Sequence, residues 1–191
     1  QKTQNVLGYT SNLGALVREE MSPSKYWLFA FGAGVETTNI HGTSTAFGYA
    51  GSVDGSPTSI GKTFADREFT NHAYEASLAF RPSDQWQWRG RIGTGYGTPQ
   101  IGNLFITPAG VAGNNTQLDS QKNVGYDLGF DWTPAKWFRL SVTGYYEFFE
   151  NELVSQSPGA GLQNFTFNAP ASEHRGVEVA ANWSPVPGWR A

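Results

Sequence analysis

Few residues of this chain combine a type and a spacing that could carry out chemistry. The run Gly93-Thr94-Gly95-Tyr96-Gly97 is glycine-rich like a phosphate-binding loop, but no helical pattern follows it. The helix N-terminus that would hold a phosphate is therefore missing. Glycines within a curved strand instead allow neighbouring backbone to approach closely, and we favour this interpretation.

Three neighbouring carboxylates could form an acid–base set or a cation site: Glu147, Glu150 and Glu152. Only Glu147 belongs securely to an alternating strand, and the other two fall where that strand ends, so a solvated rim is the simpler interpretation. The three histidines are far apart, with no metal-ligand spacing. No serine lies in the context of an activated nucleophile. We expect no catalytic residue, metal or cofactor, and hence no enzyme.

Strands must position these residues. From Phe138 to Phe148 apolar and polar residues alternate over 11 positions, a length that crosses a bilayer at the usual tilt. The preceding segment alternates as clearly, with Asp127 and Asp131 on its polar face, which suits a wet lumen. We expect seven strands at roughly residues 8–20, 26–40, 67–81, 86–97, 121–132, 137–152 and 173–183, with an eighth opening at Trp189.

The connections between these strands alternate in length. Four are short and contain proline, at Pro23, Pro82, Pro134 and Pro185. Three are long and rich in Gly, Ser, Thr, Asn and Pro, at about residues 41–66, 98–120 and 153–172. Long structureless loops are unusual in a compact domain. Outer-membrane barrels have short periplasmic turns and long extracellular loops, so the proline turns are expected in the periplasm.

The tryptophans all lie beside the proline turns. Indole rings prefer the boundary between hydrocarbon and water, where membrane-spanning strands carry aromatic girdles. The predicted membrane-interface girdle comprises Trp27, Trp86, Trp88, Trp132, Trp137, Trp183 and Trp189. We therefore expect an all-β, membrane-spanning, antiparallel up-and-down barrel, present as an open partial barrel of about seven or eight strands.

The composition agrees with a membrane barrel and excludes other classes. The mean hydropathy is −0.41, and no run of about 20 apolar residues could form a membrane-spanning helix. Only 15% of the 191 residues are charged and the net charge is −3, which gives no basic surface for nucleic acid. The absence of cysteine excludes a disulfide scaffold and a thiolate metal site.

Several charged residues are predicted to face the lumen. In a barrel interior they could line a substrate path, or pair with each other and with a further domain. Because buried charges need partners, we favour structural pairing. The predicted lumen-facing charges are Arg89, Arg91, Arg139, Glu147 and Glu178.

Four segments together resemble the barrel of the TonB-dependent outer-membrane receptors. The stretch 91–105 is similar to a family strand that ends in a glycine-aromatic-proline run and leads into an extracellular loop. Residues 123–129 resemble the N-Y-E-L-G passage, with Asp127 where glutamate is usual, and residues 145–154 resemble the strand end that follows it. Arg175-Gly176-Val177-Glu178 matches the R-G-V-E box. The order of these segments is that of the family.

The resemblance implies that residues 1–191 are part of one barrel domain of ~22 strands with a plugged lumen, taken from its later half, without the plug domain or the terminal strands. It implies energy-coupled uptake of a scarce nutrient, a ferric siderophore or similar small molecule, across the outer membrane of a Gram-negative bacterium. The implied partners are the lipid bilayer, the plug domain, an inner-membrane energy-transducing complex and the small-molecule substrate.

Ligand contact is expected from the loop after Pro99 and the loop around Phe165, because aromatic and amide groups at the top of a lumen can stack on and hydrogen-bond a solute. The candidates are Tyr96, Gln100, Asn103, Phe105, Phe165 and Phe167. The aromatic members could equally belong to an outer girdle, and both interpretations stay open.

Two other classes compete with this one. A small passive outer-membrane barrel of about eight strands would be an adhesin, a structural protein or an outer-membrane enzyme. A soluble sandwich or lipocalin-like binder is disfavoured, because its apolar face should point inward and its tryptophans should not gather along one rim.

Overall fold

The computed structural model describes residues 4–48 and 58–184 as one antiparallel sheet in which every strand pairs with the next along the chain. Its strands are β1 (Gln4–Ser24), β2 (Trp27–Gly48), β3 (Thr58–Ser83), β4 (Trp86–Gly97), β5 (Gln121–Ala135), β6 (Phe138–Gln156) and β7 (Phe165–Trp183). One 3-10 helix, η1 (Ile101–Phe105), follows β4. None of the described residues forms a helix long and apolar enough to cross a membrane.

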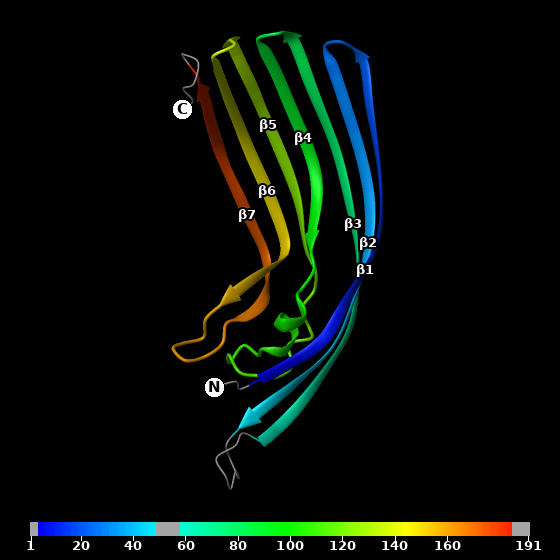
Figure 1. Cartoon of the computed structure of the whole chain (residues 1–191), viewed down its shortest axis with the longest axis vertical. Helices are drawn as coiled ribbons and strands as arrows, with labels where there is room; N and C mark the ends of the chain where they lie inside the picture. The colour runs from blue at the N-terminus through cyan, green and yellow to red at the C-terminus, as the bar shows by residue number, and fades with distance from the viewer. Residues whose placement is uncertain (1–3, 49–57, 185–191) are drawn as a thin grey trace.

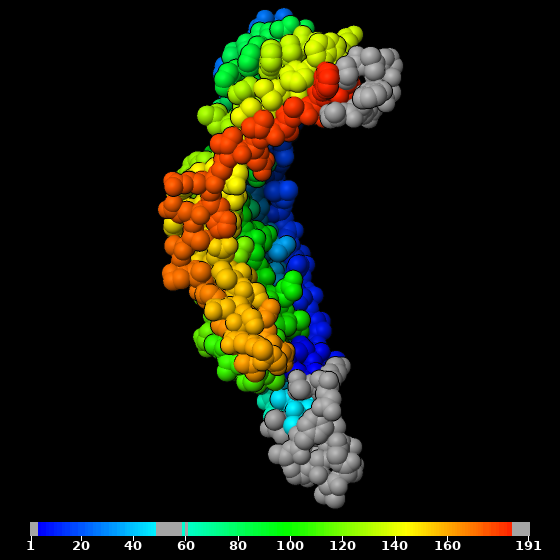
Figure 2. Space-filling view, turned by 90° about the vertical axis from the view of Figure 1, so that its left-hand side faces the viewer, coloured from blue at the N-terminus to red at the C-terminus, as the bar shows by residue number. Residues whose placement is uncertain are grey.

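The sheet is open. Its strand order is that of the sequence, and β1 and β7 lie at opposite edges without pairing to each other (Figure 1). In the view turned by 90° the blue first strand and the orange-red last strand lie on different sides of a curved wall (Figure 2). The predicted incomplete barrel with seven strands is therefore confirmed; the turn at Pro185, Trp189 and an eighth strand lie outside the described residues.

The three described short turns share one construction. Each follows a β-bulge that contains a proline, at Pro23, Pro82 and Pro134. A carbonyl in each turn then accepts a hydrogen bond from the end of the next strand but one, as in Arg81 N–H on β3 to Tyr26 O at 2.7 Å. Proline lacks an N–H and is tolerated where the ladder is interrupted, so these bulges place it at little cost.

Two of the three predicted long loops are largely strand, which corrects the sequence-based boundaries. β2 and β3 continue to Gly48 and from Thr58, and β6 and β7 continue to Gln156 and from Phe165. Both hairpins keep their register throughout these extensions, apart from one shift beside Ala46. The sequence lost its alternation there because neither face is uniformly apolar, whereas β-branched threonine still favours a strand.

The two faces of the sheet differ in chemistry. Register pairs place Trp88, Phe130 and Val142 in one row, and this apolar face exposes large side chains such as Leu128 (68% exposed). The opposite, polar face carries charged and small residues, including Arg89. An apolar face this extensive is not stable in water and requires a covering of protein or lipid.

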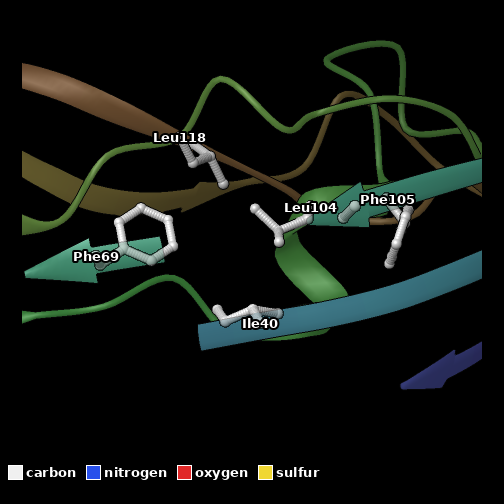
Figure 3. Packing of buried hydrophobic residues seen from close by; sticks show 6 residues of the cluster. Ile40, Phe69, Leu104, Phe105 and Leu118 are labelled. Atoms are coloured by element: carbon white, nitrogen blue, oxygen red, sulfur yellow. The ribbon is translucent and has the colours of Figure 1, made fainter. Parts of the chain in front are cut away.

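The sheet splits at the end with the long connections. The last β3–β4 pair is Glu75–Gly93, although β3 itself continues to Thr58 beside β2. The connection 98–120 lies beside this split (Figure 1), and the packing of its buried side chains against Ile40 and Phe69 places it on the polar face. Its side chains form a small core with those of β2 and β3 (Figure 3). This core consists of Ile40, Ala65, Phe69, Leu104, Phe105 and Leu118.

Candidate functional site

Ion pairs cross the polar face near the turn end of the sheet. Arg18 on β1 reaches Glu75 on β3 at 3.3 Å, and Glu75 also pairs with Arg91 on β4 at 3.8 Å. Arg91 continues the chain of charges to Asp127 on β5 at 3.6 Å. Arg18 can reach past β2 because Gly32 lies between it and Glu75 in the register, and a Cβ there would meet Glu75 Cγ at 2.9 Å.

A second charge cluster crosses a glycine in the same way, three strands further along the sheet. Arg89 Nη2 donates to Ser141 Oγ at 2.9 Å and to Thr143 Oγ1 at 2.8 Å, both on β6, by crossing over Gly129 of β5. The buried carboxylate of Asp131 accepts from the Ser141 hydroxyl and pairs with Arg89 at 3.4 Å and with Arg139 at 3.3 Å. We call this the Asp131 cluster.

Three of the five predicted lumen-facing charges are therefore held by partners on the sheet itself: Arg89, Arg91 and Arg139. Glu147 and Glu178 lie on the same polar face, and neither has a cation within ion-pair distance among residues 4–48 and 58–184. On the polar face the three arginines are thus paired within the sheet, whereas the carboxylates of Glu147 and Glu178 can still pair with a cation from another part of the protein.

The connection 98–120 is fastened on both sides of the split. Arg67 on β3 donates to the carbonyl of Thr116 and pairs with Asp119 at 3.2 Å. On the other side Asn115 donates to the Thr166 carbonyl on β7 at 2.9 Å, and Asn168 donates to the Asp119 carbonyl at 3.0 Å. The connection is a structured bridge between β3 and β7.

A contact between two connections extends this bridge. The Gln163 N–H, in the β6–β7 connection, donates to Gly110 O at 3.0 Å. Gly110 has φ +71°, and a Cβ on it would lie 2.5 Å from Pro158 Cγ and 2.8 Å from Gln163 O. Glycine is required here by both conformation and space.

We expect Gly110→Val to separate the two connections. The left-handed conformation costs a branched residue about 1–2 kcal/mol, and the added side chain would displace Pro158. Limited proteolysis of whole cells that carry the full-length protein should show faster cleavage within residues 98–120. Gly161→Val is the matched control: its φ is +80° but nothing lies within 4 Å of a Cβ there. Equal cleavage of the two variants would contradict the contact.

A polar hollow of about 540 Å³ lies on the polar face beside the beginning of the connection. Its volume is in the usual range of small-molecule sites. It lies between β1, β2, the end of β4 and the beginning of the connection 98–120. Its lining residues are Thr10, Asn12, Glu36, Thr38, Tyr96, Thr98, Pro99, Gln100 and Ile101. We call it the Glu36 hollow. Larger hollows exist. One of about 720 Å³ is lined by residues such as Leu78 and Leu128 of the apolar face, and one of about 750 Å³ lies at the turn end and is lined by residues such as Arg81 and Arg139.

The structure distributes the six predicted ligand contacts over different environments. Tyr96 and Gln100 line the Glu36 hollow. Asn103 donates to Thr166 Oγ1 at 2.8 Å and thereby helps to attach the connection 98–120 to β7. Phe105 is fully buried in the core of the connection, where a solute has no access to it.

Phe165 and Phe167 lie close together, with ring centroids 5.8 Å apart. Thr166 between them faces the bridge, so alternation directs both rings to the opposite face. This placement favours an interface role for these two residues over ligand contact.

Sequence reasoning missed the β1 and β2 side of the hollow. Glu36 and Thr38 fall at the end of a predicted strand, and only their even spacing with Ile40 indicates that they share a face. The register then brings Asn12 opposite Thr38. Glu36 and Thr38 lie about 60 positions before Tyr96 in the sequence and Asn12 lies further away still, so no local motif could connect them to it.

The aromatic residues mark both ends of the apolar face. The six described tryptophans lie at or beside the turn end. Neighbouring rings contact each other there, as in Trp86 and Trp132, whose ring centroids are 5.8 Å apart. Nearer the other end Tyr126 and Tyr146 approach each other with ring centroids 6.5 Å apart, and Tyr74 is 58% exposed. Two aromatic rows with aliphatic residues between them are the arrangement of a membrane-spanning strand surface.

Antiparallel strands with one apolar and one polar face, and with an open edge on each side, define this chain as a wall segment of a large membrane-spanning β-barrel. Residues 3–191 match the family model described as "TonB dependent receptor-like, beta-barrel". The chain belongs to this family, whose members are outer-membrane receptors of Gram-negative bacteria.

Individual relatives agree with this assignment. The chain is 26% identical to the pesticin receptor of Yersinia enterocolitica over 133 residues, which are 68% of this chain and 19% of that receptor. The structure matches the copper transporter OprC with a TM-score of 0.73 at 14% identity, covering 95% of this chain and 28% of that one. It matches the ferric yersiniabactin uptake receptor FyuA of Yersinia pestis with a TM-score of 0.66 at 21% identity, covering 98% and 27%. The solved structures show the fold, and the chain spans less than a third of each relative.

Proposed function

We propose that this chain forms part of an outer-membrane receptor that takes up a scarce nutrient, a ferric siderophore or a similar small molecule, by an energy-coupled route. The family match over residues 3–191 carries the proposal. The Glu36 hollow supports it, because it offers a solute polar groups on the face that a closed barrel would turn toward its lumen. The aromatic rows support a position in the outer membrane with the short turns in the periplasm.

The proposed receptor needs a plug domain in the lumen and an inner-membrane complex that supplies energy. The carboxylates of Glu147 and Glu178 support a plug, since both lie on the polar face without a cation partner in the described part of the chain. A plug that fills the lumen would take these carboxylates out of water, where an unpaired charge is costly. Basic side chains of a plug would remove that cost.

Uptake of ⁵⁵Fe by living cells tests this proposal. Cells that lack the gene, and cells complemented with the full-length gene, would receive medium from iron-starved cultures loaded with ⁵⁵Fe. We expect the complemented cells to accumulate iron and a proton-motive-force uncoupler to abolish this accumulation. Accumulation that persists with the uncoupler would favour the passive barrel. Equal accumulation with and without the gene would exclude iron complexes as substrates.

A further inference from the structure

Charge is divided unevenly along the polar face. Near the turn end five arginines lie on this face. Four of them pair with a carboxylate of the sheet, and the fifth, Arg81, donates to Gln87 Oε1 at 2.9 Å; the paired ones are Arg18, Arg89, Arg91 and Arg139. Beyond the Arg91–Asp127 pair, toward the long connections, the face carries Glu36 and Glu147. Arg67 is the one lysine or arginine on that half within the described strands, and Asp119 and the Thr116 carbonyl occupy it.

Glu36 is the charged residue of its hollow. Thr38 Oγ1 donates to Glu36 Oε1 at 3.2 Å, and no cation of the described chain lies within ion-pair distance of the carboxylate. The remaining lining is neutral, with hydroxyls of Thr10, Thr98 and Tyr96 and amides of Asn12 and Gln100. Carboxylate and hydroxyl oxygens accept hydrogen bonds, so the hollow offers an ammonium group a charge-assisted partner and several neutral acceptors.

An anionic group would meet the opposite conditions there. A carboxylate or phosphate placed in the hollow would lie beside Glu36 with no cation to compensate it, and like charges in a confined site repel. The described residues contain no cluster of His, Cys, Asp or Glu suited to a metal ion, so a bare cation would have few ligands. A protonated amine on a hydroxylated solute fits the lining better than either.

We infer that the Glu36 hollow is a subsite for a protonated amine on a hydroxylated small molecule, and that it discriminates against anionic solutes. The inference rests on the proposed function, because it assigns the hollow to the substrate path. Glu36 supplies the charge, and the Tyr96, Thr98 and Asn12 side chains orient the hydroxyl groups around it. The charge preference belongs to this wall of the lumen and holds for whichever part of the substrate contacts it.

Three sugars that share one scaffold test this inference: glucosamine, glucose and glucuronate, offered below neutral pH so that the amine is protonated. Saturation-transfer NMR would measure their binding to the full-length receptor in outer-membrane vesicles, against vesicles without it. We expect wild-type receptor to prefer glucosamine over glucuronate by up to about fivefold, the largest ratio that one solvent-accessible ion pair supplies. Glu36→Gln should reduce this preference to near unity while the receptor still folds.

Glu68→Gln is the matched control. It removes a carboxylate from β3 at a similar height, but Glu68 is paired with Asn39 on the other face of the sheet and is exposed. This variant should keep the wild-type preference. Equal response to the three sugars, a preference for glucuronate, or equal effects of the two substitutions would overturn the inference. Uncoupler-sensitive iron uptake measured in the same cells would show that the proposed function stands even if the charge preference fails.

Discussion

Replacing Leu128 by arginine is expected to destabilise the full-length barrel by about 2–4 kcal/mol, the cost of a cation near the middle of the lipid-facing surface. Leu128 lies on the apolar face of β5, is 68% exposed, and is flanked in the register by Gly90 and Gly144. Neither neighbour can shield the charge. The loss should appear as a lower urea midpoint when the receptor is unfolded from phospholipid vesicles.

Asn123→Arg on the same strand is the control for this prediction. Asn123 lies on the polar face, one register step from the Gly125–Glu147 pair, whose carboxylate has no cation partner among the described residues. An arginine there enters a wet lumen and can pair with Glu147. A larger loss for Asn123→Arg than for Leu128→Arg would mean that the two faces are assigned the wrong way round. Ser141→Arg would be a poor control, because Ser141 is bonded within the Asp131 cluster.

Asp131→Asn is expected to destabilise the barrel by about 1.5–3 kcal/mol, since it removes hydrogen bonds to charged groups from a buried carboxylate. The Asp131 side chain is only 8% exposed and pairs with both Arg89 and Arg139. The amide keeps the shape but leaves two arginines without their counter-charge. The same urea titration in vesicles should report the loss.

Asp127→Asn makes the same chemical change four residues away. The Asp127 side chain is 38% exposed and pairs only with Arg91, at 3.6 Å. Exposed ion pairs contribute little, so this variant should lose less than about 1 kcal/mol. Equal losses of stability in the two variants would mean that burial does not strengthen the interactions of the Asp131 carboxylate.

The fold was predictable from the sequence where one face meets an apolar medium. Alternation from Phe138 to Phe148 and the tryptophans beside Pro82 and Pro134 suffice to place strands and turns. Toward the long connections the alternation of apolar and polar residues stops. The extensions of β2, β3, β6 and β7 could therefore not be distinguished from loops in the sequence. Backbone pairing sustains those extensions, and backbone pairing leaves no trace in side-chain periodicity.

The candidate site was predictable only in part. Tyr96 and Gln100 follow from a local motif, whereas Glu36 joins them through the register of three strands and the fold of the connection. Phe105 shows the opposite failure. Its position in a loop suggested contact with a solute, but the polar face of β2 and β3 carries Ile40 and Phe69, which receive it as a core residue. Two apolar residues on an otherwise polar face are the signal that could have indicated this docking.

The glycine crossings have a mechanical consequence. A backbone ladder joins each strand only to its neighbours, so strands can slide in shear when a load acts along one of them. Arg18 and Arg89 each span three strands by passing over Gly32 and Gly129. When an outer strand slides past the other two, a side-chain bond to the opposite outer strand must break as well as the ladder bonds to the middle strand. In the proposed energy-coupled receptor, a force applied from the turn end would be spread over the wall by such cross-ties.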